Sequence, residues 1–150
     1  DKAQRKYEEE RQPDVLRNAQ EFFATVTGGR YERLISPLGS QVITALSPDG
    51  SSKAMSQLSR GTEDQLYLAL RFGLIREFGA RSAHLPVVVD DILVNFDPER
   101  AYRAAQAFVE LSQTNQVLVF TCHPETVALF TKADPRTQVI DLSDKTSLAG

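Results

Sequence analysis

The amino-acid sequence predicts an α/β fold in which a mostly parallel sheet is flanked by helices. From Leu85 onward, short apolar runs alternate with segments of helical periodicity, which is the pattern of parallel strands joined by right-handed helical crossovers. Between Tyr31 and Leu46, two short stretches of alternating polarity are separated by turn residues. These stretches indicate a small antiparallel hairpin or meander near the N-terminus.

Two helices are expected in the first half of the chain. Residues 13–26 start with Pro-Asp, continue with apolar residues at helical spacing and end before Gly28-Gly29, and the pair Phe22-Phe23 should lie in the core. Residues 51–57 are polar and should form a loop. The second helix should begin near Ser59 and end near Gly79. Its expected inward stripe consists of Leu66, Ala69, Leu70, Gly73, Leu74 and Phe78.

The second half should contain three strands and two helices. The expected strands are Leu85–Val89, Gln116–Thr121 and Thr137–Leu142, and the expected helices are Pro98–Ser112 and Pro124–Phe130. Because Leu85–Val89 is a continuous apolar run, it is typical of a strand that is covered on both faces.

Composition excludes some function classes. The chain has 150 residues, enough for about one domain, and 41% of them are hydrophobic, so a real core is possible. The net charge of −3 shows no overall basic character for binding nucleic acid or a membrane. Cys122 is the only cysteine, which fits a reducing, cytoplasmic location, with nucleoid association as an option. No apolar run approaches the roughly 20 residues of a membrane span.

The N-terminal residues 1–12 are almost all polar and favour a helix, and the chain starts without Met. We therefore expect a piece of a longer protein, with residues 1–12 as the end of a coiled-coil or helical arm and residues 13–150 as the globular part.

Two adjacent acids follow an apolar strand. Asp90 and Asp91 come after Val87-Val88-Val89, and ligands of open α/β sheets bind at the carboxyl ends of strands. A divalent cation such as Mg²⁺, or a polarised water, would make two neighbouring carboxylates tolerable there. The alternative is a strand that ends in a turn with two solvated acids.

A second motif, LSRGTEDQ, spans Leu58–Gln65. Ser59 stands at an N-cap position, and Gly61 allows another group to approach the backbone closely. The free N–H groups of the following helix could bind an anion, although a well-capped amphipathic helix explains the same residues.

A third motif, TCHP, places His123 after a buried strand. A neutral imidazole there could donate to a phosphate oxygen or orient a water, although a structural histidine is the commoner outcome. A metal role for Cys122-His123 is not expected, because the chain has no other cysteine and His84 is the only other histidine.

Taken in order, these motifs resemble the C-terminal lobe of an ABC-type P-loop NTPase head. The resemblance is strongest to the branch containing the structural-maintenance-of-chromosomes (SMC) proteins, the double-strand-break-repair ATPases and the YhaN-type AAA proteins, and it covers roughly residues 55–141. LSRGTEDQ resembles the signature motif and VVVDD the Walker B motif with its catalytic acid. The NFD segment that ends at Asp97 resembles the D-loop, and TCHP resembles the switch-histidine loop.

The resemblance implies roles for single residues. Asp90 would hold Mg²⁺, Asp91 would polarise the attacking water, and His123 would contact the γ-phosphate of ATP. The residues implied at the nucleotide of another subunit or at the dimer interface are Ser59, Gly61, Gln65, Asn95 and Asp97. The implied partners are an N-terminal Walker A lobe of the same protein and a second head across ATP, and DNA and a nuclease subunit are further candidates.

The chain departs from this family pattern twice. The family usually has Glu where this chain has Asp91, and the shorter side chain withdraws the carboxylate by on the order of 1 Å, which can slow hydrolysis strongly. In addition, none of the eight glycines precedes a lysine, so the phosphate loop is absent. In the family that loop lies near the N-terminus beyond a coiled coil, and the chain alone is therefore expected to be inactive.

Two other functions stay open. One is a non-hydrolysing assembly module gated by ATP, which the Asp at position 91 favours. The other is a self-contained magnesium-dependent phosphatase or nuclease that uses Asp90, Asp91 and Asp97, since such enzymes need several convergent oxygens.

Overall fold

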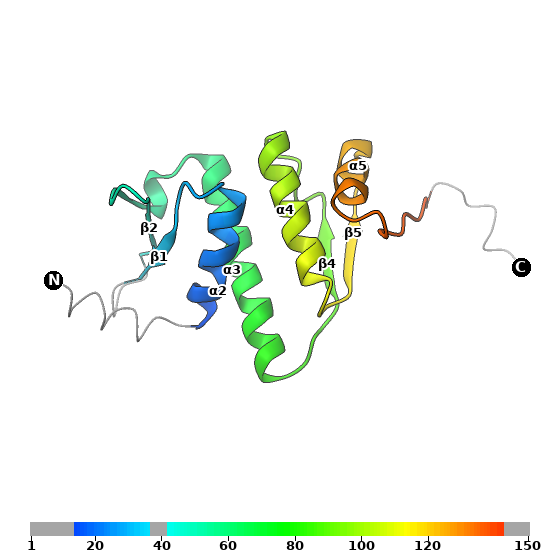
Figure 1. The fold of residues 1–150 in the computed structure, drawn as a ribbon, viewed down its shortest axis with the longest axis horizontal. Helices are drawn as coiled ribbons and strands as arrows, with labels where there is room; N and C mark the ends of the chain where they lie inside the picture. The colour runs from blue at the N-terminus through cyan, green and yellow to red at the C-terminus, as the bar shows by residue number, and fades with distance from the viewer. Residues whose placement is uncertain (1–13, 37–41, 143–150) are drawn as a thin grey trace, which may run out of the picture.

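A computed structural model describes residues 14–36 and 42–142, and the expected arm at residues 1–12 lies outside them. The elements are, in order, α2 (Asp14–Val26), β1 (Arg33–Ile35), β2 (Thr44–Leu46), β3 (Ser52–Ala54), the 3-10 turn η1 (Met55–Gln57), α3 (Arg60–Arg81), β4 (Val87–Asp90), α4 (Pro98–Leu111), β5 (Val117–Phe120) and α5 (Pro124–Ala133). Figure 1 shows the antiparallel strands at one end of the molecule and β4, β5 and α5 at the other, with α2, α3 and α4 between them. None of the helices in these ranges has the length and apolar character of a membrane-crossing helix.

The antiparallel meander is confirmed. Strand β2 pairs with β1 on one side and with β3 on the other. The expectation of a loop over residues 51–57 was wrong, because Ser52–Ala54 is the third strand. Its side chains are mostly exposed, so it carries no apolar pattern that could have indicated a strand.

The parallel pairing of the two apolar strands is also confirmed. Strands β4 and β5 are parallel, with Val87 opposite Val117 and Asp90 opposite Phe120. The expected last strand, Thr137–Leu142, is wrong, because these residues form no strand in the structure. Val139 is 58%, Ile140 77% and Leu142 70% exposed, so the described residues leave the apolar side chains of this segment largely uncovered.

A row of neighbouring aromatic rings forms the centre of the core. The ring centroids of Phe22 and Phe72 lie 4.0 Å apart, those of Phe72 and Phe108 4.8 Å, and those of Phe108 and Phe130 6.0 Å. The row therefore connects α2, α3, α4 and α5, and aromatic pairs at these distances attract each other beyond their area burial. The prediction that the Phe22-Phe23 pair belongs to the core is confirmed.

The buried stripe of α3 differs from the predicted one. Leu66, Ala69 and Gly73 are buried as expected, but Leu74 is 56% and Phe78 48% exposed. The buried face is set by α2, which crosses α3 so closely that a Cβ on Gly73 would overlap a backbone carbonyl oxygen of α2. Helix α3 also continues two residues beyond Gly79, to Arg81.

One face of the β4–β5 pair is uncovered. Val88 is 62% exposed, and its neighbours on the same face, Leu118 and Phe120, are 40% and 46% exposed. The prediction that this strand is covered on both faces is therefore wrong for the described residues. The apolar sequence suits a doubly covered strand, but the described chain covers only the face that carries Val89.

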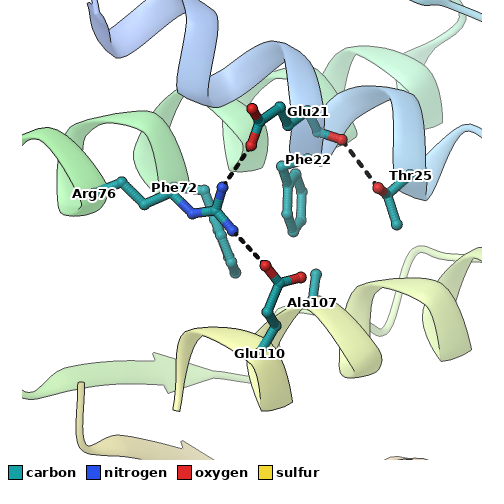
Figure 2. Close-up of a pocket in the computed structure, with 7 residues that line it drawn as sticks. All are labelled: Glu21, Phe22, Thr25, Phe72, Arg76, Ala107 and Glu110. Carbon is teal, nitrogen blue, oxygen red and sulfur yellow. Dashed lines mark hydrogen bonds and ion pairs between the residues drawn. The ribbon is translucent and has the colours of Figure 1, made fainter. Parts of the chain in front are cut away.

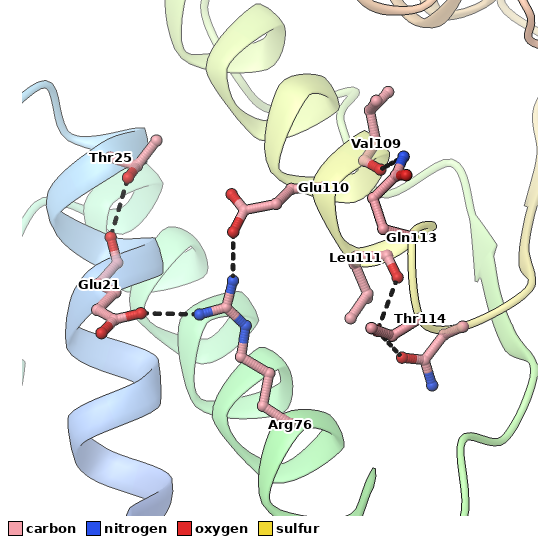
Figure 3. A network of polar contacts seen from close by, with 9 residues as sticks. Glu21, Thr25, Arg76, Val109, Glu110, Leu111, Gln113 and Thr114 are labelled. Carbon is pink, nitrogen blue, oxygen red and sulfur yellow. Dashed lines mark hydrogen bonds and ion pairs between the residues drawn. The ribbon is translucent and has the colours of Figure 1, made fainter. Parts of the chain in front are cut away.

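An ion-pair bridge joins three helices beside the aromatic row. The Arg76 guanidinium of α3 lies 2.8 Å from a Glu21 carboxylate oxygen on α2 and 3.0 Å from a Glu110 oxygen on α4 (Figures 2 and 3). These three residues, with Phe22, Thr25, Phe72 and Ala107, line a cleft of about 160 Å³. That volume is below the roughly 300 Å³ of small-ligand pockets, so the cleft is a packing feature of the helix junction.

Candidate functional site

The candidate site lies at the edge of the sheet where β4 and β5 end. Because the two strands are parallel, their carboxyl ends lie side by side, and the residues after them face a common region. Helices α4 and α5 begin at the same end of the molecule, as does α3 (Figure 1). The topology thus brings the ends of two strands and the starts of three helices to one side.

The two acids after β4 differ in conformation. Asp90 is the last residue of the strand and its side chain is exposed. Asp91 adopts a left-handed backbone conformation with φ 44°, the only such non-glycine residue among those described, and its N–H donates to the Phe120 carbonyl at 3.0 Å. Asp tolerates this conformation better than most residues. The backbone therefore turns Asp91 toward the end of β5.

Asp91 and the TCHP loop form one side-chain cluster. The Thr121 hydroxyl donates to Asp91 Oδ1 at 2.6 Å, and Asp91 Oδ2 lies 3.7 Å from Cys122 Sγ and 4.0 Å from His123 Nε2. The His123 N–H also donates to the Thr121 hydroxyl oxygen at 3.1 Å. The two residues predicted as catalytic, Asp91 and His123, are therefore brought together across 32 positions of sequence.

The surroundings of Asp91 favour its charged form. The hydrogen bond from the Thr121 hydroxyl is the main cause that holds the pKa of the Asp91 carboxyl below its ordinary value, and the charge of His123 lowers it further. Asp91 is thus an ionised acceptor at neutral pH, able to orient a water or a cation.

Sequence reasoning missed Thr121 and Cys122 as parts of this cluster. Thr121 has no distinctive signal, since a threonine at the end of a strand is ordinary. Cys122 gives no metal-site signal in the sequence, because the chain has no other cysteine and only one histidine besides His123. The Asp91 carboxylate lies 31 positions from Cys122 in the sequence and comes close to it only because β4 and β5 pair.

The start of α3 leaves its first-turn donors open. Ser59 is the N-cap residue, but its hydroxyl makes no cap hydrogen bond to the backbone and instead lies 2.9 Å from the Thr62 hydroxyl. A Cβ on Gly61 would meet no atom of the described residues within 4 Å. The first helical N–H groups lack partners within an α-helix, so this end can receive an anion.

Gln65 is buried, whereas Ser59 is exposed. It is 1% exposed, and its side-chain oxygen has no hydrogen-bond partner among the residues that the structure describes. In this arrangement it cannot touch a nucleotide directly, and any support that it gives acts through helix α3.

The NFD segment leads into α4. Asn95 is exposed, and Asp97 is the N-cap residue of α4. One Asp97 oxygen accepts the Arg100 N–H at 3.1 Å, and the other lies 3.1 Å from the Arg100 side chain. Both carboxylate oxygens of Asp97 therefore already have partners, which disfavours Asp97 as a metal ligand.

Known proteins resemble this chain in sequence and in structure. No protein-family profile matches it. Over 112 residues it is 38% identical to the uncharacterized protein YhaN of Bacillus subtilis (strain 168), and this match covers 74% of the chain but 12% of YhaN.

Solved structures of SMC heads share its fold. A chain from a study of ATP-driven dimerization and DNA-stimulated activation of SMC ATPases matches 77% of this chain with 71% of its own, at a TM-score of 0.63 and 25% identity. The Smc head of Pyrococcus furiosus, solved with the C-terminal domain of ScpA, gives a TM-score of 0.59 at 25% identity. This match covers 77% of this chain and 30% of the Pyrococcus chain. The SMC head domain of Thermotoga maritima gives a TM-score of 0.60 at 21% identity, and the match covers 83% of this chain and 41% of that one. The chain therefore has the fold of part of an SMC head and is similar in sequence to part of YhaN.

Proposed function

We propose that this chain is the C-terminal lobe of a head that binds and hydrolyses ATP with Mg²⁺ and dimerises around the nucleotide. The proposal rests on the convergence of Asp91 and His123 at the ends of two parallel strands, where Asp91 Oδ2 lies 4.0 Å from His123 Nε2. An ionised acid beside an imidazole suits the placing of an attacking water next to a γ-phosphate.

Asp90 fits the role of magnesium ligand. Its carboxylate is exposed at the end of β4, and Mg²⁺ prefers hard oxygen ligands of this kind together with phosphate oxygens and water. Bound there, Mg²⁺ would neutralise charge on the phosphates. Asp91, the next residue, faces Thr121 and His123 instead, so the two acids have separate tasks.

Ser59 and Gly61 are proposed to contact the γ-phosphate of ATP that a second head holds. The Ser59 hydroxyl, which makes no cap hydrogen bond to the backbone, and the open space at Gly61 support this role. Asn95 and Asp97 are proposed to lie at the interface between the two heads, where the exposed turn before α4 could link the sites.

The missing phosphate loop is proposed to come from an N-terminal lobe of the same protein. The uncovered face of Val88, Leu118 and Phe120 supports this partner, because an exposed apolar sheet face is typical of an interaction surface. The chain also matches only 12% of YhaN, which leaves room in a related protein for such a lobe. DNA and a nuclease subunit are further partners of the assembled protein in this proposal.

The test is to combine the chain with the N-terminal lobe encoded by the parent gene and to measure ATP turnover. We expect turnover that depends on Mg²⁺ in the mixture and none with either part alone. Equal turnover by the chain alone would contradict the proposal. A mixture that assembles on ATP but does not hydrolyse it would instead favour an assembly module.

A further inference from the structure

Asp91, Cys122 and His123 present three different metal-binding atoms to one point. A carboxylate oxygen, the thiol sulfur and an imidazole nitrogen all lie within 4.8 Å of one another. From this geometry we propose that the three residues form a zinc site and that Zn²⁺ bound there blocks ATP hydrolysis. The inhibitory part rests on the function proposed above.

The distances are close to those of a formed site. Around tetrahedral zinc, with bonds of about 2.0–2.3 Å, neighbouring ligand atoms lie roughly 3.3–3.6 Å apart. In the structure Asp91 Oδ2 is 3.7 Å from Cys122 Sγ and 4.0 Å from His123 Nε2. Zinc binding would shorten these two separations by less than about 1 Å, and the third pair of ligand atoms, on Cys122 and His123, is within 4.8 Å.

The cluster is held in place by groups that do not bind the metal. The Thr121 hydroxyl donates to the other Asp91 oxygen, Oδ1, at 2.6 Å and accepts the His123 N–H at 3.1 Å. The Asp91 N–H is bonded to the Phe120 carbonyl across the strand pair. Outer partners of this kind orient metal ligands and raise affinity, commonly by about 10–100-fold.

The chemistry of the three donors selects the ion. A thiolate and an imidazole with one carboxylate suit Zn²⁺, whereas Mg²⁺ prefers oxygen ligands alone. Cys122 and His123 are exposed and Asp91 is partly buried, so an ion can enter from solvent. Three protein ligands leave the fourth zinc position to a water. Binding would release the thiol proton to solvent, so affinity should fall as the pH is lowered.

The consequence for hydrolysis follows from which residues would be bound. Zn²⁺ would occupy Asp91 and His123, the two groups that are proposed to act on the attacking water and on the γ-phosphate. Asp90, the proposed magnesium ligand, is not in the cluster. Zinc should therefore slow hydrolysis, and Cys122, which has no part in the proposed hydrolysis, should determine how sensitive the head is to zinc.

The binding test uses Co²⁺ as a spectroscopic probe of the chain, followed by displacement with Zn²⁺. We expect one equivalent of Co²⁺ to give visible tetrahedral bands and a thiolate-to-cobalt charge-transfer band, and Zn²⁺ to remove both. Cys122→Ser should abolish the charge-transfer band, and His123→Gln or Asp91→Asn should weaken Zn²⁺ binding by more than about 100-fold, beyond the effect of losing an outer partner.

The matched control is His84→Gln, which removes the other histidine and should leave binding unchanged. Circular dichroism of each metal-free variant checks folding, and Cys122→Ser changes an exposed side chain, so it should fold normally. Absence of the thiolate band in the unaltered chain, or equal zinc affinity of the chain and His123→Gln, would overturn the site.

The inhibition test uses the assembled head. We expect zinc to reduce its ATP turnover at least tenfold and Cys122→Ser to remove most of that effect. Equal inhibition of both proteins would refute the inhibitory role. A head that hydrolyses no ATP even without zinc would refute the proposed function while leaving the cobalt result standing.

Discussion

The Thr121 hydroxyl donates a 2.6 Å hydrogen bond to Asp91 Oδ1, and this contact joins the ends of two parallel strands. It restrains the carboxylate on which hydrolysis is proposed to depend, and it is the main cause of the lowered Asp91 pKa. Because the donor and the acceptor lie 30 positions apart, the contact exists only when β4 and β5 are paired.

Replacing Thr121 by Val should raise the Asp91 pKa toward its ordinary value, because the main favourable contact of the charged form is lost. A carboxyl whose pKa is lowered by folding stabilises the fold above its unfolded pKa of about 3.9, and this stabilisation is lost as the pH falls. The variant should therefore lose less stability on acidification than the unaltered chain. The Asp91 carboxyl signal, followed by NMR across pH 2–6, measures the shift.

Thr121→Ser is the matched control, since it keeps the hydroxyl, and its Asp91 pKa should stay lowered. An unchanged Asp91 pKa in Thr121→Val would show that the hydroxyl does not control this carboxylate.

Replacing Gly73 by Ala should destabilise the chain by about 1–3 kcal/mol, the usual cost of overpacking. The new Cβ would overlap the Val15 carbonyl oxygen and lie 3.0 Å from the Ala19 backbone nitrogen, so α2 and α3 would have to separate. Urea unfolding measures the change. Gly61→Ala, whose Cβ meets nothing within 4 Å, controls for helix propensity and should not destabilise. Equal effects of the two changes would contradict the close packing.

Replacing Arg76 by Met should lower stability by at most about 1 kcal/mol, because both of its ion pairs are near the surface. The loss should shrink in 1 M salt, where surface charges are screened. Arg76→Lys should recover only part of it, since one ammonium group does not reproduce the fork that reaches Glu21 and Glu110. A loss that does not depend on salt would mean that packing of the side chain, not charge, is what matters.

Replacing both Val88 and Leu118 by Thr should weaken assembly with the N-terminal lobe about tenfold or more. The changes make the uncovered face polar. Threonine is β-branched like the valine that it replaces at position 88, so the chain itself should stay folded. Titration calorimetry of the two lobes measures the affinity. Val139→Thr, at a residue that is 58% exposed outside the sheet, is the control and should have no effect. Unchanged assembly of the double variant would exclude this face as the contact.

The sequence predicted the elements that local pattern determines. The long helices, the antiparallel meander and the parallel order of the two apolar strands were all visible as periodicity and turn chemistry. Strand β3 was missed because its exposed residues have no apolar pattern. Thr137–Leu142 was wrongly predicted as a strand, because β-branched residues alone do not supply a partner strand.

The candidate site was predictable only in part. Asp91 and His123 stand out because each follows an apolar strand, which places both at the same edge of a sheet. Their contact with Thr121 and Cys122 depends on strand register and on the left-handed turn at Asp91, which no local pattern encodes. The burial of Gln65 depends in the same way on how α3 is rotated against α2.

The most direct test of the account is Asp91→Asn in the head assembled from both lobes. Asn tolerates the left-handed backbone at this position, so the fold should be kept, and it retains an oxygen but loses the charge. We measure ATP binding and single-turnover hydrolysis of the variant against the unaltered head. We expect ATP binding to be unchanged and hydrolysis to fall by about 10²–10⁴-fold. Hydrolysis at the unaltered rate would contradict it.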